Sequence, residues 1–147
     1  MLQLLIDPFI KYGTFTGRAT RREFWAFASL FAIATIGAHF FDLRDGEIEP
    51  IAGGMGIVEL IAFLVLLLPF VSAGARRLHD SGRSGWWMLF LYLPYLAFVA
   101  AAGNEELTIA TAGGLVVGAA ALVILFALPG TAGMNAFGPD PRDPPPN

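Results

Sequence analysis

Long apolar stretches alternate with short polar segments along the chain, and four of these stretches are long enough to cross a membrane as helices. They cover residues 24–41, 51–75, 86–103 and 107–128, and Glu59 is the only residue in them with a formal charge. A bilayer's hydrocarbon core is about 30 Å thick, which an α-helix crosses in roughly 20 residues. The pattern therefore predicts an all-α integral membrane four-helix bundle. We expect one membrane domain over residues 1–140, followed by a disordered Pro-rich tail over residues 141–147.

The positive charges of the chain predict its orientation. Of the nine Lys and Arg residues, all but Arg44 lie before the first stretch, between the second and third, or after the fourth. The other two connecting segments are acidic, with Asp42, Asp45, Glu47, Glu49, Glu105 and Glu106. Because short basic segments stay in the cytoplasm, we expect both termini and the loop over residues 76–85 on the cytoplasmic face.

The amino-acid composition excludes several kinds of functional site. The chain is 56% hydrophobic and 14% charged, with a mean hydropathy of +0.64. It has no Cys, which excludes disulfides, thiol nucleophiles and cysteine metal sites. Its two histidines, His39 and His79, are too few for a histidine-rich metal centre. We therefore expect no metal and no cofactor.

Several local signals predict where helices begin and end. Asp7 and Pro8 predict the start of a short helix along the inner membrane interface, because the apolar residues around them fall on one face. Residues 20–23, Thr-Arg-Arg-Glu, form the pattern of a capping box and predict the start of the first membrane helix. Residues 80–82 predict a turn, in which Gly82 takes the positive φ, and Ser84 is placed to cap the next helix.

Three motifs resemble the signatures of a known family. Residues 15–25 read FTGRATRREFW, residues 75–87 read ARRLHDSGRSGWW, and the third motif runs from Pro129-Gly130 to NAFGPD at residues 135–140. In these motifs the chain resembles domain-of-unknown-function family 805, which consists of small bacterial inner-membrane proteins. The resemblance extends over almost the whole chain. It implies a multi-pass protein of the bacterial inner membrane with four spans and cytoplasmic motifs, and it implies no activity.

The predicted orientation puts all three motifs on the cytoplasmic face, where their polar side chains are expected to converge. Arginine forks bind phosphate and carboxylate groups with two parallel bonds, and basic pockets between membrane helices bind anionic lipid heads. The candidate ligand-binding residues are Arg18, Arg21, Arg22, Arg76, Arg77, His79, Asp80, Arg83 and Asn135. In the simpler alternative these arginines only fix the topology, and Asp80 is a turn residue or an ion-pair partner of Arg76.

The sequence favours a hydrolytic enzyme less than a binding protein. His79, Asp80, Ser81 and Ser84 include the residue types of a hydrolytic triad, but neighbours within one turn rarely point at a common centre. We assign no catalytic residue, and Glu23 is interpreted as a helix cap.

The leading function is thus an integral inner-membrane protein of unknown activity, whose Arg-rich cytoplasmic face binds anionic lipid headgroups or a partner. The alternative is a small oligomeric transporter or channel component, with the intramembrane acid Glu59, Pro69 and the Gly-rich fourth stretch as its polar site and flexible parts. The expected partners are membrane lipids and a second copy of the chain, and no nucleic acid.

Overall fold

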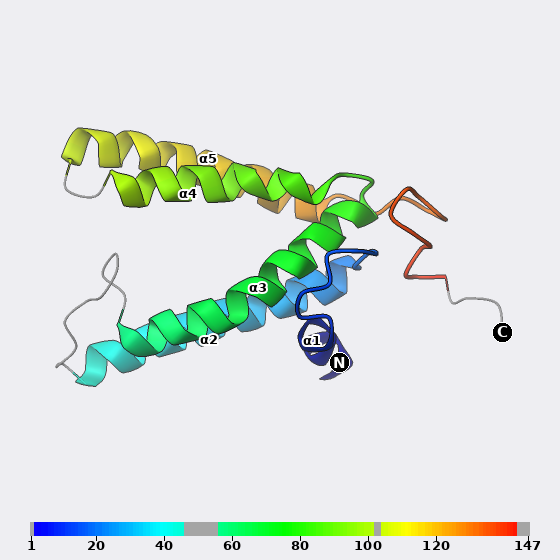
Figure 1. The fold of residues 1–147 in the computed structure, drawn as a ribbon, viewed down its shortest axis with the longest axis horizontal. Coiled ribbons are helices and arrows are strands. Elements are labelled where there is room, and N and C mark those ends of the chain that lie inside the picture. Colours follow the sequence, from blue (N-terminus) through cyan, green and yellow to red (C-terminus); the bar gives the residue numbers. More distant parts are fainter. Residues whose placement is uncertain (1, 46–55, 102–103, 144–147) are drawn as a thin grey trace. The chain divides into compact units, whose positions relative to one another are not determined.

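The structure is a computed structural model, and it describes residues 2–45, 56–101 and 104–143. Within these ranges the regular structure is helical, apart from one isolated bridge between Asn135 and Gly138. This confirms the all-α prediction. Figure 1 shows the helices in chain order, which are α1 (Leu2–Ile10), α2 (Arg21–Asp45), α3 (Ile57–Asp80), the 3-10 turn η1 (Gly85–Met88), α4 (Leu89–Ala100) and α5 (Glu105–Ala127).

Three helices of the described chain are long and apolar enough to span a membrane. They are α2 over Arg21–Arg44, α3 over Ile57–Asp80 and α5 over Glu105–Ala127. The first begins directly after Thr20, and α5 ends two residues before Pro129, as predicted.

The third predicted stretch, residues 86–103, has a different form. It starts with η1, whose cap Ser84 accepts a bond from the Trp86 amide, and continues as the twelve-residue helix α4. Twelve residues rise about 18 Å, which is less than the hydrocarbon thickness. Residues 102–103 lie outside the described part of the chain. This stretch is therefore not among the three helices long enough to cross by themselves.

The described chain divides into two compact units. The first comprises Met1–Thr14 and Arg22–Ala73, and the second comprises Phe15–Arg21 and Gly74–Asn147. Each unit holds one pair of long apolar segments.

Aromatic side chains fill the first unit. Phe31 of α2 stacks on Phe70 of α3 with a centroid distance of 4.7 Å, and its edge contacts Phe63 at 5.9 Å. Phe9 of α1 packs edge-on against Phe27 of α2 at 5.4 Å. Aromatic pairs of this geometry stabilise packing beyond the area that they bury, so they hold α1, α2 and α3 together.

The end of the α2–α3 pair that includes the start of α3 is held by polar contacts. The carboxylate of Asp42 accepts bonds from the amides of Val58 (3.2 Å) and Glu59 (2.8 Å), which caps α3 from the neighbouring helix. Gly56 permits this approach, because a Cβ there would overlap the Asp42 side chain. Glu59 also lies 2.8 Å from His39 Nδ1.

The N-terminal helix begins earlier than predicted. It starts at Leu2, so Asp7 is not its cap and Pro8 lies inside it. The Pro8 side chain is fully buried, and this packing offsets the helix hydrogen bond that a proline cannot donate. Ile6, Phe9 and Ile10 are exposed to 39%, 41% and 70%, so α1 carries an uncovered apolar surface, as expected of an interfacial helix.

In the second unit α4 lies alongside α5, as Figure 1 shows. Asn104 caps α5 by accepting from the Leu107 amide at 3.0 Å, and Gly118 and Leu122 of α5 are buried. Because Asn104 opens α5 only four residues after α4 ends, the two helices form a tight hairpin.

Candidate functional site

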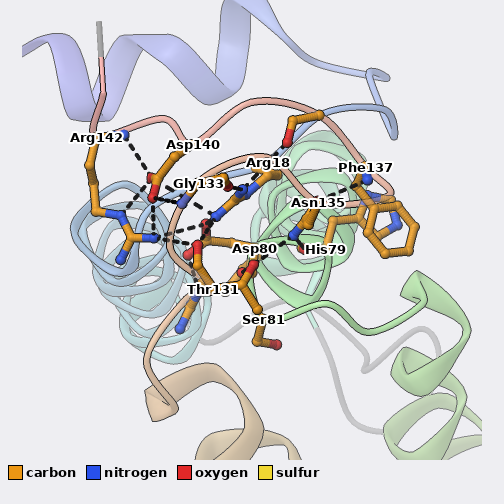
Figure 2. Close-up of polar contacts among 12 residues, drawn as sticks. Arg18, His79, Asp80, Ser81, Thr131, Gly133, Asn135, Phe137, Asp140 and Arg142 are labelled. Atoms are coloured by element: carbon orange, nitrogen blue, oxygen red, sulfur yellow. Dashed lines mark hydrogen bonds and ion pairs between the residues drawn. The ribbon is translucent and has the colours of Figure 1, made fainter.

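The three sequence motifs meet within the second unit. Arg18 comes from the first motif, Arg77 and Asp80 lie in the last turn of α3, and the segment 131–142 follows α5. Figure 2 shows the side chains of Arg18, Asp80 and Thr131 pointing toward one another. The convergence that the sequence predicts is therefore present for these residues.

The carboxylate of Asp80 is the centre of this network. Its Oδ1 accepts from Arg18 Nε at 3.0 Å and Nη2 at 2.8 Å, and its Oδ2 accepts from Arg77 Nη1 at 2.7 Å. The side chains of Arg18, Arg77 and Asp80 are exposed to only 1%, 0% and 3%. Asp80 thus contacts two buried guanidinium groups, and Asp140 Oδ1 lies 3.9 Å from Arg18 Nη2. Two guanidinium groups carry more donors than these carboxylates accept, so the arginines need further acceptors.

Backbone carbonyls supply those acceptors. Arg18 Nη1 donates to Gly133 O at 2.6 Å and its Nη2 donates to Thr131 O, while Arg77 Nε donates to Phe126 O at 2.9 Å and its Nη2 to Leu128 O. Helix C-termini present carbonyls without intrahelical donors and favour positive charge there. Every nitrogen of both guanidinium groups therefore bonds to an oxygen of this protein.

The segment after α5 is tied to the end of α3 at Thr131. Its amide donates to Asp80 O at 2.8 Å, and its hydroxyl lies 3.2 Å from the same oxygen. The preceding residue must be small, because a Cβ at Gly130 would overlap the Asp80 carboxylate. This close approach gives Gly130 of the third motif a steric role.

A second ion pair closes the network at the C-terminal side. Arg142 Nε donates to Asp140 Oδ1 at 2.6 Å and its Nη2 to Oδ2 at 2.8 Å, and Nη2 also reaches Thr131 O at 2.8 Å. This two-pronged contact lowers the pKa of Asp140 from 3.8 to about 2. Neither residue was among the predicted site residues: Asp140 was assigned to the third motif without a role, and Arg142 to the Pro-rich tail as a topological charge. Residues 141–143 belong to the described chain, and residues 144–147 lie outside it.

Asn135 and His79 join the third motif to the second. Asn135 Nδ2 donates to His79 O at 2.9 Å and to Thr131 Oγ1 at 2.8 Å, and its Oδ1 accepts from the Phe137 amide. The His79 ring stacks on Phe137 with a centroid distance of 4.0 Å and an angle of 4°. His79 Nδ1 lies 3.1 Å from Gly17 O, so this nitrogen carries the proton in that contact.

The other predicted site residues lie around or apart from this network. Arg76 is buried, and its carbonyl accepts from the Ala19 amide at 3.0 Å. Arg21 is exposed and donates to Ala127 O at 3.2 Å, while the half-buried Arg83 donates to Ser81 O at 3.2 Å. Arg22, also exposed, belongs to the first unit, as does Glu59.

The side chains that could have formed a hydrolytic triad bond to different partners. Ser81 Oγ donates to Leu78 O at 2.9 Å, Ser84 caps η1, and Asp80 pairs with arginines. These side chains do not form a triad. In the described ranges no three His, Asp or Glu side chains are grouped closely enough to hold a metal ion.

Comparison with known proteins gives a consistent match. Residues 12–139 match the family described as "Protein of unknown function (DUF805)". The chain is 33% identical to "Inner membrane protein YhaH" of Escherichia coli (strain K12) over 132 residues, which cover 89% of each chain. It is 29% identical to "Inner membrane protein YhaI" of the same organism over 141 residues, covering 96% of this chain and 97% of the relative. No solved structure matches. The chain therefore belongs to the DUF805 family, and it is a multi-pass integral protein of the inner membrane.

Proposed function

We propose that the protein is a non-enzymatic four-span membrane protein whose cytoplasmic face binds anionic lipid headgroups. One observation carries the proposal: the hydrogen-bonded network joins Arg18, Asp80 and the segment 131–142. These three parts of the chain contact one another, so they belong on the same side of the membrane.

This contact supports four crossings. The end of α3 contacts the segment that follows α5. If α3 and α5 both span the membrane, this contact requires residues 81–104 to cross as well, which is the topology that we propose. Together η1 and α4 rise about 26 Å, close to the hydrocarbon thickness. Trp86 and Trp87, exposed to 77% and 42%, suit the membrane interface at the start of that crossing. With four crossings, every basic segment faces the cytoplasm, as the positive-inside rule requires.

The burial and hydrogen bonds of the arginines support different roles for two groups of them. Arg18 and Arg77 are buried and fully bonded to protein oxygens, so they fix the shape of the face. Arg21 and Arg83 are more accessible, and Nη1 of each donates a hydrogen bond to a backbone carbonyl. Guanidinium groups have five donors, which leaves these two with capacity for phosphate oxygens of the anionic cytoplasmic leaflet.

Native mass spectrometry of the purified protein tests the proposal. We expect retained phosphatidylglycerol in preference to phosphatidylcholine, and about tenfold weaker retention in Arg21→Gln and Arg83→Gln, because each loses charge-assisted contacts. Arg83→Lys should also weaken retention, because an ammonium group does not replace the guanidinium fork. Arg44→Gln is the matched control, since Arg44 is exposed and lies at the opposite end of α2. Equal retention by the parent and all four variants would leave these arginines with a topological role only.

The alternative function is a small oligomeric transporter or channel component. It is favoured by the contact of Glu59 with His39, since an acid inside a membrane-spanning helix is a candidate site for ions or protons. The same spectra report the number of subunits. An oligomer without retained anionic lipid would favour this alternative.

A further inference from the structure

Pro69 interrupts the hydrogen bonds of a membrane-spanning helix. It lies inside α3, its side chain is fully buried, and it has no N–H to donate to the carbonyl of Val65 one turn earlier. In the hydrocarbon region no water is present to take the place of the missing donor. The Val65 carbonyl therefore lacks its usual donor one turn later, and a donor from another part of the protein can take that place.

Tyr12 supplies that donor. Its hydroxyl lies 2.6 Å from Val65 O, although the two residues are 53 positions apart. Tyr12 follows α1 directly, and both belong to the first unit. The phenol thus restores the bond that Pro69 removes from α3.

Further contacts hold the same segment at this turn of α3. Ser72 Oγ lies 3.1 Å from Pro69 O and 3.4 Å from Lys11 O, and Ser72 is completely buried. Lys11 Nζ lies 3.8 Å from the Glu23 carboxylate of α2. Residues 11 and 12 are therefore bonded to both long helices of the unit.

The segment also continues into the uncovered apolar surface of α1. Ile10, two residues before Tyr12, is exposed to 70%, and Phe9 reaches α2 through Phe27. An apolar surface of this kind on a short helix is suited to the headgroup and acyl boundary. One short segment thus connects a lipid-facing helix to the interrupted turn of α3.

We propose that Tyr12 is a latch that couples the docking of α1 to the conformation of α3 at Pro69. When α1 is docked, the Val65 carbonyl is satisfied and the proline is tolerated in the span. When α1 leaves, that carbonyl is exposed to lipid, and α3 must change its local backbone to satisfy it. A change in the membrane surface that moves α1 is in this way transmitted to a membrane-spanning helix.

A double-mutant cycle tests the latch. Tyr12→Phe removes only the hydroxyl, and Pro69→Ala restores an amide that can bond to Val65 O within the helix. We expect Tyr12→Phe to speed hydrogen exchange of the α1 amides about tenfold in the parent, since the bond to a carbonyl that lacks its usual i+4 donor is lost. In the Pro69→Ala background it should change the exchange little. Equal acceleration in both backgrounds would overturn the coupling.

Ser29→Ala is the matched control for the hydroxyl. Ser29 Oγ donates to Trp25 O at 2.9 Å, a carbonyl that the amide of Ser29 can also serve within α2. Its removal should leave α1 exchange unchanged. If Pro69→Ala does not fold, Tyr12→Phe against Ser29→Ala still decides the matter: faster exchange confined to residues 2–12 and the α3 turn around Pro69 supports the latch, and parent-like exchange refutes it.

Discussion

Asp80 is the residue on which the network around Arg18 and Arg77 depends. Its carboxylate faces two buried arginines. Arg18 also bonds to Gly133 O in the segment after α5, and Arg77 bonds to Phe126 O in the last turn of α5. Removing one partner from a buried ion pair leaves the other charge without compensation, which costs far more than an exposed pair contributes. The charge of Asp80, not its place in a turn, is therefore its main contribution.

We predict that Asp80→Asn destabilises the protein by about 3 kcal/mol, because two buried guanidinium groups lose their counter-ion. Thermal unfolding of the purified protein in detergent measures the loss. Asp143→Asn is the matched control, since Asp143 is exposed and should tolerate the change. Indistinguishable melting temperatures for the two variants would show that the network does not hold the fold.

At the scale of elements, the sequence predicts helices well where apolar runs and caps agree. The start of α2 after Thr20, the positive φ of Gly82 and the cap at Ser84 all follow from local patterns. The 3-10 turn before α4 does not follow from a local pattern, and its first residue lies close to α3. A Cβ at Gly85 would lie only 2.9 Å from Ala75 Cβ.

The network was predictable in its residue types but not in its partners. Positive charge and motif order indicate that Arg18, Arg77 and Asp80 converge. They do not indicate that Arg18 pairs with Asp80 across 62 positions, so the sequence left open whether the arginines form a binding site or only fix the topology. Arg142 was missed for a related reason. The Pro-rich composition of residues 141–147 predicts disorder, and it does not indicate that Arg142 forms a two-pronged contact with Asp140.

The segment after α5 should stay tied to Asp140 well into the acid range. Because Arg142 lowers the pKa of Asp140 to about 2, the contact adds stability that is complete above the ordinary value of 3.8 and is lost as the pH falls from there toward 2. We predict a carboxyl titration midpoint near 2 for Asp140, measured by carbon NMR in detergent micelles. In Arg142→Gln the midpoint should rise toward 3.8. An ordinary midpoint in the parent would contradict the contact.

At the scale of the whole molecule, the number of crossings decides whether one face can hold the network. The three candidate spans alone would leave the ends of α3 and α5 on opposite sides, and the bonds between Asp80 and Thr131 could not form. A crossing by η1 and α4 removes this conflict. It also puts Arg142 on the same side as Lys11, Arg18 and the basic residues at the end of α3.

The topologies with three and with four crossings place Glu105 and Asn147 on opposite sides of the membrane. Because the chain has no native Cys, a single cysteine introduced at either position reports its side. With four crossings, a cysteine at Glu105 should react with a membrane-impermeant maleimide in intact spheroplasts, and one at Asn147 should react only after lysis. With three crossings, the cysteine at Asn147 should react in intact spheroplasts and the one at Glu105 only after lysis. Cysteines at Glu49 and Gly82 are common to both topologies and serve as controls, external and cytoplasmic respectively. Protection at Glu105 together with labelling at Asn147 would mean that α4 returns on the side it entered. The network of Asp80, Arg18 and the segment 131–142 would then be incompatible with membrane insertion, because its parts would lie on opposite faces.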